Sequence, residues 1–180
     1  MDQQAAVRIR PLGEPGDLGW VVMAHGETYA EEYGWDTEME AFIARIVAAF
    51  AAGHDEVREA AWIAEKDGVR VGSVFCVASD DPSVARLRVL LVSPDARGLG
   101  LGNQLVHECI DFATQAGYEQ VTLWTNDVLT SARRIYEAAA FVLVDEEKHH
   151  RFGHDLVGQN WALQLDRAAA RGSRLTTRTG

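Results

Sequence analysis

Three glycines stand at alternate positions in the segment ARGLGLGNQL, residues 96–105, directly behind an arginine. An apolar run, RLRVLLVSP, ends just before this segment, and apolar residues at helical spacing follow it. The first turn of a helix leaves backbone N–H groups unpaired and favours negative charge. Glycines in that turn allow a pyrophosphate to approach those N–H groups, and Arg97 adds a cation. The segment therefore predicts an anion site, although a flexible loop fits the glycine spacing alone equally well.

Two familiar nucleotide-binding motifs do not fit this segment. Dinucleotide-binding folds use G-x-G-x-x-G with an acidic residue on the next strand, whereas this chain has G-x-G-x-G and no such acid. A Walker sequence needs a lysine followed by serine or threonine, which is absent here. Neither nucleotide interpretation is retained.

The periodicity of the apolar residues indicates which elements must hold this segment in place. Asp17 and either Asp36 or Thr37 are predicted to cap the first two helices, and Lys66-Asp67-Gly68 is predicted to close a hairpin. We predict strands near 7–12, 59–66, 69–79, 86–94, 119–127, 141–147 and 156–166, and helices near 18–33, 36–53, 101–117 and 129–141. The order β-α-α-β-β-β-α-β-α-β-β indicates an α/β fold with a twisted, mixed sheet of about seven strands and helices on both faces.

Length and composition set the remaining bounds. The 180 residues suit a single domain over 7–166, with flexible termini at 1–6 and 167–180. The net charge of −10 argues against a nucleic-acid partner. No apolar run is long enough to span a membrane, and Cys76 and Cys109 lie in apolar contexts typical of buried thiols in a reducing compartment. We therefore expect a cytoplasmic protein.

Two blocks of the chain resemble one known family. LLVSPDARGLGLGNQLV resembles the acetyl-CoA signature of the GCN5-related N-acetyltransferases (GNAT), with Arg97, Gly100 and Gly102 matching its R/Q-x-x-G-x-G/A motif. TNDVLTSARRIYEAAAF is similar to the Asn…Tyr-Glu…Gly-Phe block on the family's last β-α unit. The resemblance covers residues 7–166. HGETYAEEYGW and FGHDLVGQNWAL further resemble the acetyltransferase half of bacterial MarR fusion proteins, here without the DNA-binding half.

The resemblance implies acetyl-CoA as cofactor and places residues around it. Leu90, Leu91 and Val92 would pair with the pantetheine arm through their backbone, and the residues from Gly98 to Asn103 would bind the pyrophosphate. The cofactor set so implied is Leu90, Leu91, Val92, Arg97, Gly98, Leu99, Gly100, Leu101, Gly102, Asn103, Asn126, Ala132, Arg133 and Tyr136.

Asn126 and Tyr136 are the implied catalytic residues. Asn126 would hydrogen-bond the pantetheine or an ordered water, and the hydroxyl of Tyr136 would protonate the departing thiolate, a role that suits a phenol of pKa about 10. Each residue type also has a structural explanation, because Asn-Asp is a common turn pair and a tyrosine on an amphipathic helix is commonly part of the core. Backbone N–H groups near Val92 would stabilise the oxyanion.

The chain departs from the family pattern in two respects. The two central strands lack the glutamate that some members use as a base, which leaves Glu27, Glu31, Glu32, a histidine, or water alone for that role. Ala140 stands where glycine usually precedes Phe141, so we expect a modified turn there.

The acceptor side is predicted from charge and aromatic content. Glu27 and Glu31 share one helical face with Tyr33 nearby, a combination that suits a cationic amine, although a solvated face explains it as well. Arg88, which shares a strand face with Arg86, would bind a carboxylate of the acceptor, and Trp124 completes the predicted substrate set. We expect His149, His150 and His154 to lie in a loop and to bind no metal, one of them being a possible base.

The sequence thus predicts an enzyme that transfers the acetyl group of acetyl-CoA to a primary amine, such as that of a free amino acid, by direct attack in a ternary complex. The alternatives are an acyl-CoA-binding sensor with weak or no catalysis, and a protein lysine or N-terminal acetyltransferase. A homodimer is compatible with the sequence.

Overall fold

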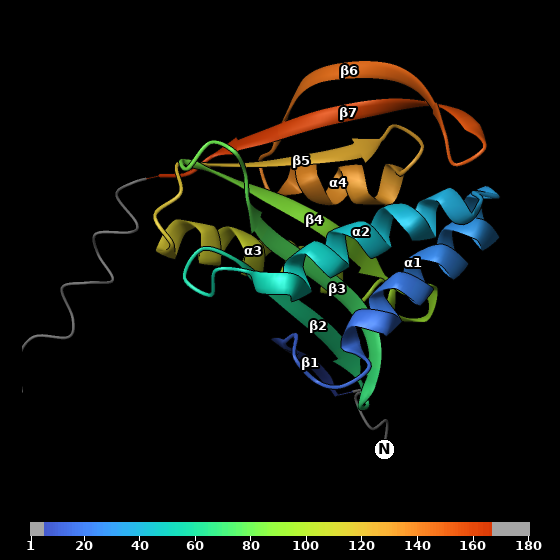
Figure 1. Ribbon diagram of the computed structural model, residues 1–180, viewed down its shortest axis with the longest axis horizontal. Helices are drawn as coiled ribbons and strands as arrows, with labels where there is room; N and C mark the ends of the chain where they lie inside the picture. The colour runs from blue at the N-terminus through green and yellow to red at the C-terminus, as the bar shows by residue number, and fades with distance from the viewer. Residues whose placement is uncertain (1–5, 167–180) are drawn as a thin grey trace, which may run out of the picture.

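A twisted, mixed seven-stranded sheet is the centre of the computed structural model, which describes residues 6–166 (Figure 1). The elements in chain order are β1 (Val7–Pro11), α1 (Asp17–Tyr33), α2 (Thr37–Gly53), β2 (Ala60–Lys66), β3 (Val69–Ala78), β4 (Val84–Val92), a short 3-10 turn (Pro94–Ala96), α3 (Leu101–Gln115), β5 (Gln120–Asn126), α4 (Thr130–Ala138), β6 (Val142–Arg151) and β7 (His154–Gln164). The predicted fold class and element order are confirmed. The predicted flexible termini, residues 1–6 and 167–180, lie outside the described residues except for Ala6, whose N–H donates to Asp67 at 2.9 Å.

The strands are ordered β1-β2-β3-β4-β5-β7-β6, so the last strand of the sheet inserts between β5 and β6. All neighbours are antiparallel except β4 and β5, which are parallel and joined through α3. The hairpin turn between β2 and β3 has Asp67 and Gly68 at φ of 52° and 80°, as the Lys66-Asp67-Gly68 sequence predicts.

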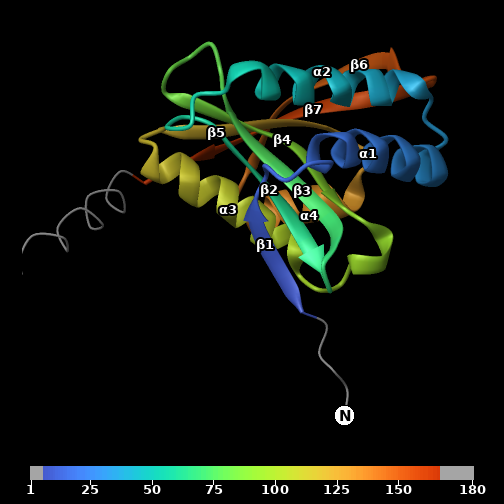
Figure 2. The same ribbon diagram turned by 60° about the horizontal axis from the view of Figure 1, so that its bottom comes forward.

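Helices cover both faces of the sheet, as Figure 2 shows for one view. α1 and α2 pack on one face over a core that includes Ile63 and Phe75. α3 and α4 pack on the other face over a second core that includes Leu105 and the two buried free cysteines, Cys76 and Cys109. None of the four described helices combines the length and the apolar run that a membrane crossing requires.

The first two helices begin in different ways. The Asp36 side chain accepts from the Glu38 N–H and caps α2, as predicted. Asp17 was expected to cap α1, but this prediction is wrong, because the cap position is Gly16 in a left-handed conformation. The buried Asp17 carboxylate instead accepts from Arg10 on β1 at 2.8 Å and from Arg70 on β3 at 2.7 Å. It therefore anchors the start of α1 to the sheet.

β4 carries a bulge and separates from β5 shortly after the two strands meet. Ser73 pairs with Leu91 and Phe75 with Arg88, so that Val89 and Leu90 together oppose one residue of β3. Val89 has a φ of 57°, which is rare for a β-branched residue, and its carbonyl accepts from the Ser73 hydroxyl at 2.9 Å. The pairing of β4 with β5 spans only Val84–Arg86 and Gln120–Thr122. Beyond these three pairs the sheet opens.

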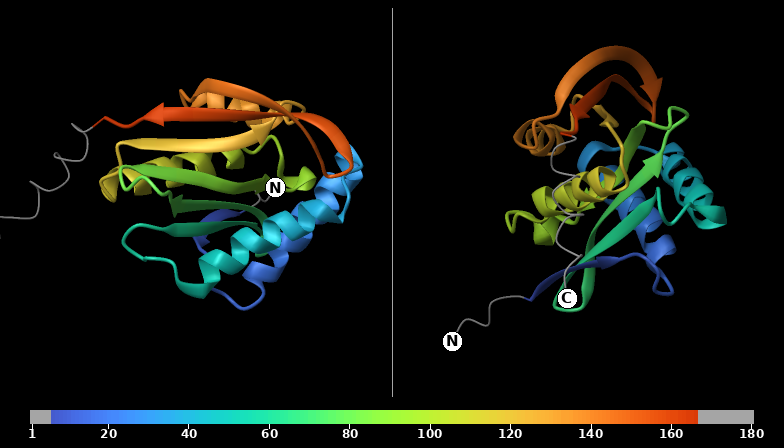
Figure 3. Two further views of the ribbon diagram at one scale, coloured as in Figure 1. Left: turned by 45° about the horizontal axis from the view of Figure 1, so that its top comes forward. Right: turned by 90° about the vertical axis from the view of Figure 1, so that its left-hand side faces the viewer.

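The β6–β7 hairpin extends over the junction of α1 and α2 (Figure 3). Phe152 in its turn stacks on Trp35 with ring centroids 5.0 Å apart, and its N–H donates to Glu38 at 2.8 Å. The expected loop of histidines is wrong, because His149 and His150 belong to β6 and His154 begins β7. The turn itself is only Phe152-Gly153, with φ values of 58° and 78°.

The modified turn expected at Ala140 is also not observed. Ala140 adopts a φ of 66°, the left-handed conformation that a glycine would take after a helix. The alanine therefore takes up the backbone strain without changing the turn.

Candidate active site

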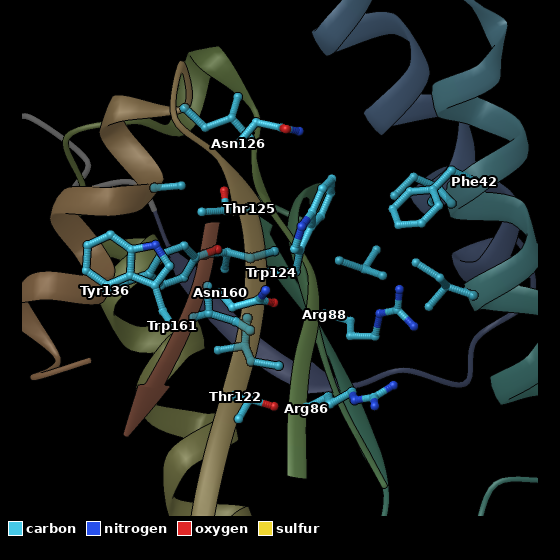
Figure 4. Close-up of a pocket in the computed structure, with 18 of the residues that line it drawn as sticks. Phe42, Arg86, Arg88, Thr122, Trp124, Thr125, Asn126, Tyr136, Asn160 and Trp161 are labelled. Carbon is cyan, nitrogen blue, oxygen red and sulfur yellow. The ribbon is translucent and has the colours of Figure 1, made fainter. Parts of the chain in front are cut away.

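A cleft with a volume of 510 Å³ lies where β4 and β5 separate. It reaches from α1 and α2 on one face of the sheet to α4 on the other (Figure 4). In this view Tyr136 and Trp161 lie on one side of β5, and Phe42 and Arg88 lie on the other. The bulge residues Val89 and Leu90 are part of the lining. A cleft of this size, open through the sheet, can hold an extended ligand with its reacting end among these side chains.

The three glycines that follow β4, Gly98, Gly100 and Gly102, have different structural reasons. Gly98 and Gly100 have φ values of 80° and 73°, and a Cβ added at Gly98 would meet nothing within 4 Å. Both therefore serve a left-handed backbone beside open space, as an anion-binding loop requires. Gly102 is buried, and a Cβ there would come within 2.5 Å of Ile135 Cδ1. The third glycine thus allows α3 to pack closely on α4.

Arg97 follows β4 and faces α1. Its Nη1 lies 2.6 Å from Glu32 Oε1, and its Nε is 3.4 Å from the Val92 carbonyl oxygen. Arg97, Gly98, Leu99, Gly100 and Asn103 are all exposed, so the predicted pyrophosphate loop is accessible from solvent.

Asn126 and Tyr136, the two predicted catalytic residues, both line the cleft and are almost fully buried, with exposed fractions of 2% and 5%. Asn126 is the last residue of β5, and its Oδ1 is 2.8 Å from Nε2 of His149. Burial raises the pKa of Tyr136 well above its ordinary value, and the nearby Tyr29 and Cys109 raise it further. The phenol therefore keeps its proton throughout the physiological pH range and can act as a donor.

Arg86 and Arg88 point from β4 into the same part of the cleft, as predicted from strand alternation (Figure 4). The Arg88 guanidinium lies 5.7 Å from the centre of the Phe42 ring. Partial burial, and the charge of Arg86, lower the pKa of Arg88. Among the described residues no carboxylate forms an ion pair with either arginine. Trp124, also predicted, lines the cleft opposite them, with its ring 6.2 Å from that of Phe42.

The predicted role of Glu27, Glu31 and Tyr33 is not supported by their positions. The buried face of α1 is formed by Val21, Ala24, His25 and Thr28, which leaves Glu27 and Glu31 exposed on the opposite face. Tyr33 packs against Tyr29 and Trp35 and does not line the cleft. The helical period of the apolar residues already separates these two faces, and it is the signal that the glutamates lie outside.

His25 is the basic group that α1 contributes to the cleft. It is 1% exposed, and its Nδ1 lies 2.7 Å from the Val21 carbonyl oxygen. Because a carbonyl can only accept, Nδ1 carries the proton and Nε2 keeps a free lone pair, which has no partner among the described residues. Burial lowers the pKa of His25 to about 4, so the ring is neutral at pH 7. No aspartate or glutamate lines the cleft in the described chain.

Some of the other predicted cofactor residues line the cleft, and the rest lie behind its wall or beside it. Leu90 and Ala132 line the cleft, whereas the side chains of Leu91, Val92, Leu101 and Arg133 do not. Arg133 donates to the Asp127 carbonyl at 3.1 Å and so holds the loop between β5 and α4. The sequence reasoning missed several lining residues from other elements, namely His25, Phe42, Thr125, Asn160 and Trp161. In the described chain no three His, Cys, Asp or Glu side chains gather as metal ligands.

Comparison with known proteins shows the family of the chain. The family model described as Acetyltransferase (GNAT) family matches residues 20–141, which is more than half of the chain. The chain is 31% identical over 93 residues to human N-acetyltransferase 8B and 30% identical over 89 residues to N-acetylaspartate synthetase of Xenopus tropicalis. Each match covers 49% of this chain but only 41% and 33%, respectively, of those relatives.

Solved structures share the fold at low sequence identity. A Salmonella typhimurium protein solved with its cofactor acetyl-CoA has a TM-score of 0.71 at 19% identity, with 89% of this chain and 95% of that chain covered. The ribosomal-protein-S18-alanine N-acetyltransferase of Escherichia coli has a TM-score of 0.66 at 20% identity, with the same coverage. With the matching family model, the two sequence blocks and the cleft between β4 and β5, the chain belongs to the GNAT family of acetyltransferases.

Proposed function

We propose that this chain is an acetyl-CoA-dependent N-acetyltransferase whose acceptor is a small primary amine that also carries a carboxylate. The observation that carries this proposal is the cleft at the separation of β4 and β5. It brings the Tyr136 hydroxyl and the Arg88 guanidinium into one cavity, and β4, which lines this cavity as far as Leu90, leads on along the chain to the glycine loop.

The residues present fit acetyl-CoA. Gly98 and Gly100 leave open space beside a left-handed backbone at the start of α3, where the helix favours an anionic group. The separated strands leave the backbone of β4 from Leu87 to Val92 without a partner on β5, so an extended pantetheine arm can lie there. When bound, acetyl-CoA supplies an acetyl thioester whose carbonyl carbon the acceptor amine attacks.

Three features of the chain would serve this chemistry. The bulge at Val89 and Leu90 interrupts the pairing of β4 with β3 in the cleft wall, so backbone N–H groups of this part of β4 are candidates for stabilising an oxyanion, beside those expected near Val92. The protonated Tyr136 hydroxyl can donate to a departing thiolate. Among the described residues of the lining, His25 has a ring nitrogen with a free lone pair, but its pKa of about 4 makes it a weak base. Water is therefore a candidate beside His25 for receiving the amine's proton.

The acceptor end favours a small molecule over a protein chain. The β6–β7 turn covers this end. It is held on α2 by the Arg151 Nε–Glu38 ion pair at 3.0 Å, and on the segment between α1 and α2 by the stacking of Phe152 on Trp35. Arg88 is half-buried and without a carboxylate partner among the described residues, which suits an anionic group on the acceptor. One of the relatives, N-acetylaspartate synthetase, is named for a product that carries carboxylates.

The test is release of free coenzyme A thiol from acetyl-CoA with a panel of acceptors. The panel contains free amino acids, their carboxamides, polyamines, aminoglycosides and lysine peptides. We expect turnover with one class of amino acid and little with its carboxamide. Tyr136→Phe is expected to lower kcat about 10²-fold or more while acetyl-CoA still binds. Gly100→Glu is expected to abolish acetyl-CoA binding.

Matched variants control for strain and for general damage. Tyr33→Phe removes a hydroxyl outside the cleft, and Gly117→Glu introduces the same left-handed strain (φ 85°) beyond the other end of α3. Both are expected to keep wild-type turnover and binding. Acetyl-CoA binding without turnover on any acceptor would indicate a sensor, turnover on peptides alone would indicate a protein acetyltransferase, and no binding would refute the proposal.

A further inference from the structure

His149 on the edge strand β6 contacts Asn126, a cleft residue of β5, from two strands away. β7 separates β6 from β5, and at its centre Gly158 pairs with Asn126 on one side and with Glu147 on the other. A Cβ at Gly158 would lie 2.7 Å from Trp124 Nε1, so the indole lies directly over this glycine. The His149 ring packs beside that indole with centroids 5.5 Å apart. The missing side chain at Gly158 is thus what lets residues of β5 and β6 meet across β7.

The contact between His149 and Asn126 has a defined polarity. His149 Nε2 lies 2.8 Å from Asn126 Oδ1, and because an amide oxygen can only accept, Nε2 carries the hydrogen. The other ring nitrogen, Nδ1, is buried without a partner among the described residues. A second proton there would be a buried donor with no acceptor, which favours the neutral tautomer that donates to Asn126.

This polarity decides what Asn126 offers to the cleft. Because Oδ1 accepts from His149, the polar group of the Asn126 amide that remains is the Nδ2 NH2 donor, which makes no hydrogen bond with a described residue. Asn126 is almost fully buried and lines the cleft, so its free hydrogens are available to a ligand there. We infer that His149 is a positioning residue, which fixes the Asn126 amide so that a donor, and not an acceptor, faces a carbonyl oxygen of the bound pantetheine arm. This inference rests on the proposed use of acetyl-CoA.

The test compares acetyl-CoA binding by titration calorimetry with steady-state KM values. His149→Ala is expected to raise the Kd and the KM for acetyl-CoA roughly 5- to 20-fold and to leave the KM for the acceptor unchanged. His149→Gln is expected to recover most of the affinity, because its side-chain amide can donate from nearly the same place. His150→Ala is the matched control, because the exposed His150 side chain interacts with the exposed Asp155 among the described residues, and this variant should bind acetyl-CoA like the wild type.

The double variant distinguishes positioning from general damage to the fold. If His149 acts through Asn126, then adding His149→Ala to Asn126→Ala should cause no further loss of affinity. Independent, multiplying losses in the double variant would overturn the inference, as would equal affinity of His149→Ala and His150→Ala. A wild-type protein that does not bind acetyl-CoA would refute the proposed function, which is a separate result.

Discussion

Arg97 Nη1 and Glu32 Oε1 lie 2.6 Å apart and join the glycine loop to the end of α1. Both side chains are partly exposed, at 44% for Arg97 and 23% for Glu32. An anion that binds at the loop must therefore share Arg97 with Glu32 or displace Glu32 from it. The ion pair makes Glu32 a competitor for the proposed pyrophosphate.

Removal of the Glu32 charge should strengthen acetyl-CoA binding. We expect Glu32→Gln to lower the Kd about 2- to 5-fold at low salt, with the difference shrinking at high salt because exposed charges are screened. Glu31→Gln removes the same charge from a neighbouring exposed residue with no ion pair among the described residues, and it should change little. Calorimetry at two salt concentrations measures both. A higher Kd in Glu32→Gln would show instead that the Arg97–Glu32 ion pair orders the loop for binding.

Replacement of Arg88 should affect acceptors according to their charge. Arg88→Ala is expected to raise the KM for a carboxylate-bearing acceptor about 10- to 100-fold, because a charge-assisted, bidentate contact is lost. Arg88→Lys should recover part of this loss. The carboxamide analogue of the acceptor serves as the control substrate, and its KM should not change. An unchanged KM for the carboxylate acceptor would exclude Arg88 from acceptor binding.

Stability should depend on pH through His25. Its pKa is about 4 in the folded protein against 6.5 when unfolded, so the unfolded chain binds more protons between these values. The free energy of unfolding should therefore fall as the pH drops from 6.5 to 4, by about 3 kcal/mol in total for this group, and its contribution should level off below pH 4.

A pair of histidine variants isolates this contribution. His25→Gln should lose this part of the pH dependence, measured by urea unfolding at several pH values. His107 provides the control, because its Nδ1 makes the same contact with the carbonyl four residues earlier, at 2.7 Å, but on an exposed part of α3. His107→Gln should keep the wild-type slope. Equal slopes in both variants would contradict the burial argument.

Ala140 offers a route to a more stable protein. Its φ of 66° is unfavourable for alanine and free for glycine, so Ala140→Gly should raise the free energy of unfolding by about 1 kcal/mol. The preceding Ala139 has a φ of −87°, and Ala139→Gly should give no gain and a loss of up to about 1 kcal/mol. Urea unfolding of the two variants tests the difference. Destabilisation by Ala140→Gly would show that the alanine methyl group makes a stabilising contact.

Local patterns predicted the fold, and alternation along β4 predicted that Arg86 and Arg88 share one face. The family resemblance implied that Asn126 and Tyr136 lie at one site. All four residues line one cleft, because each placement depends on one element or on two consecutive ones, whereas their roles stay predictions. The MarR-fusion likeness, the homodimer and the cytoplasmic location stay predictions.

The errors arose where position depends on distant elements. The polar run of residues 148–151 suggested a loop, yet these residues continue β6, which is an edge strand with β7 as its neighbour in the described sheet and is exposed along nearly its whole length. His149 meets Asn126 only because β7 lies between β5 and β6, and no local pattern reveals that insertion. Gly102 was predicted to contact the ligand, but a side chain at this position is excluded by the close approach of Ile135 on α4.

The insertion of β7 also determines when the protein becomes complete during translation. In the described part of the chain β6 pairs only with β7, so β6 leaves the ribosome before its native partner strand exists. The outer edge of β5 also stays unpaired until β7 has been synthesised. Asn160 and Trp161 of β7 are themselves part of the cleft wall. A nascent chain that ends before residue 154 therefore exposes two unpaired strand edges. The cleft can therefore be complete only after β7 has been synthesised and has paired with β5.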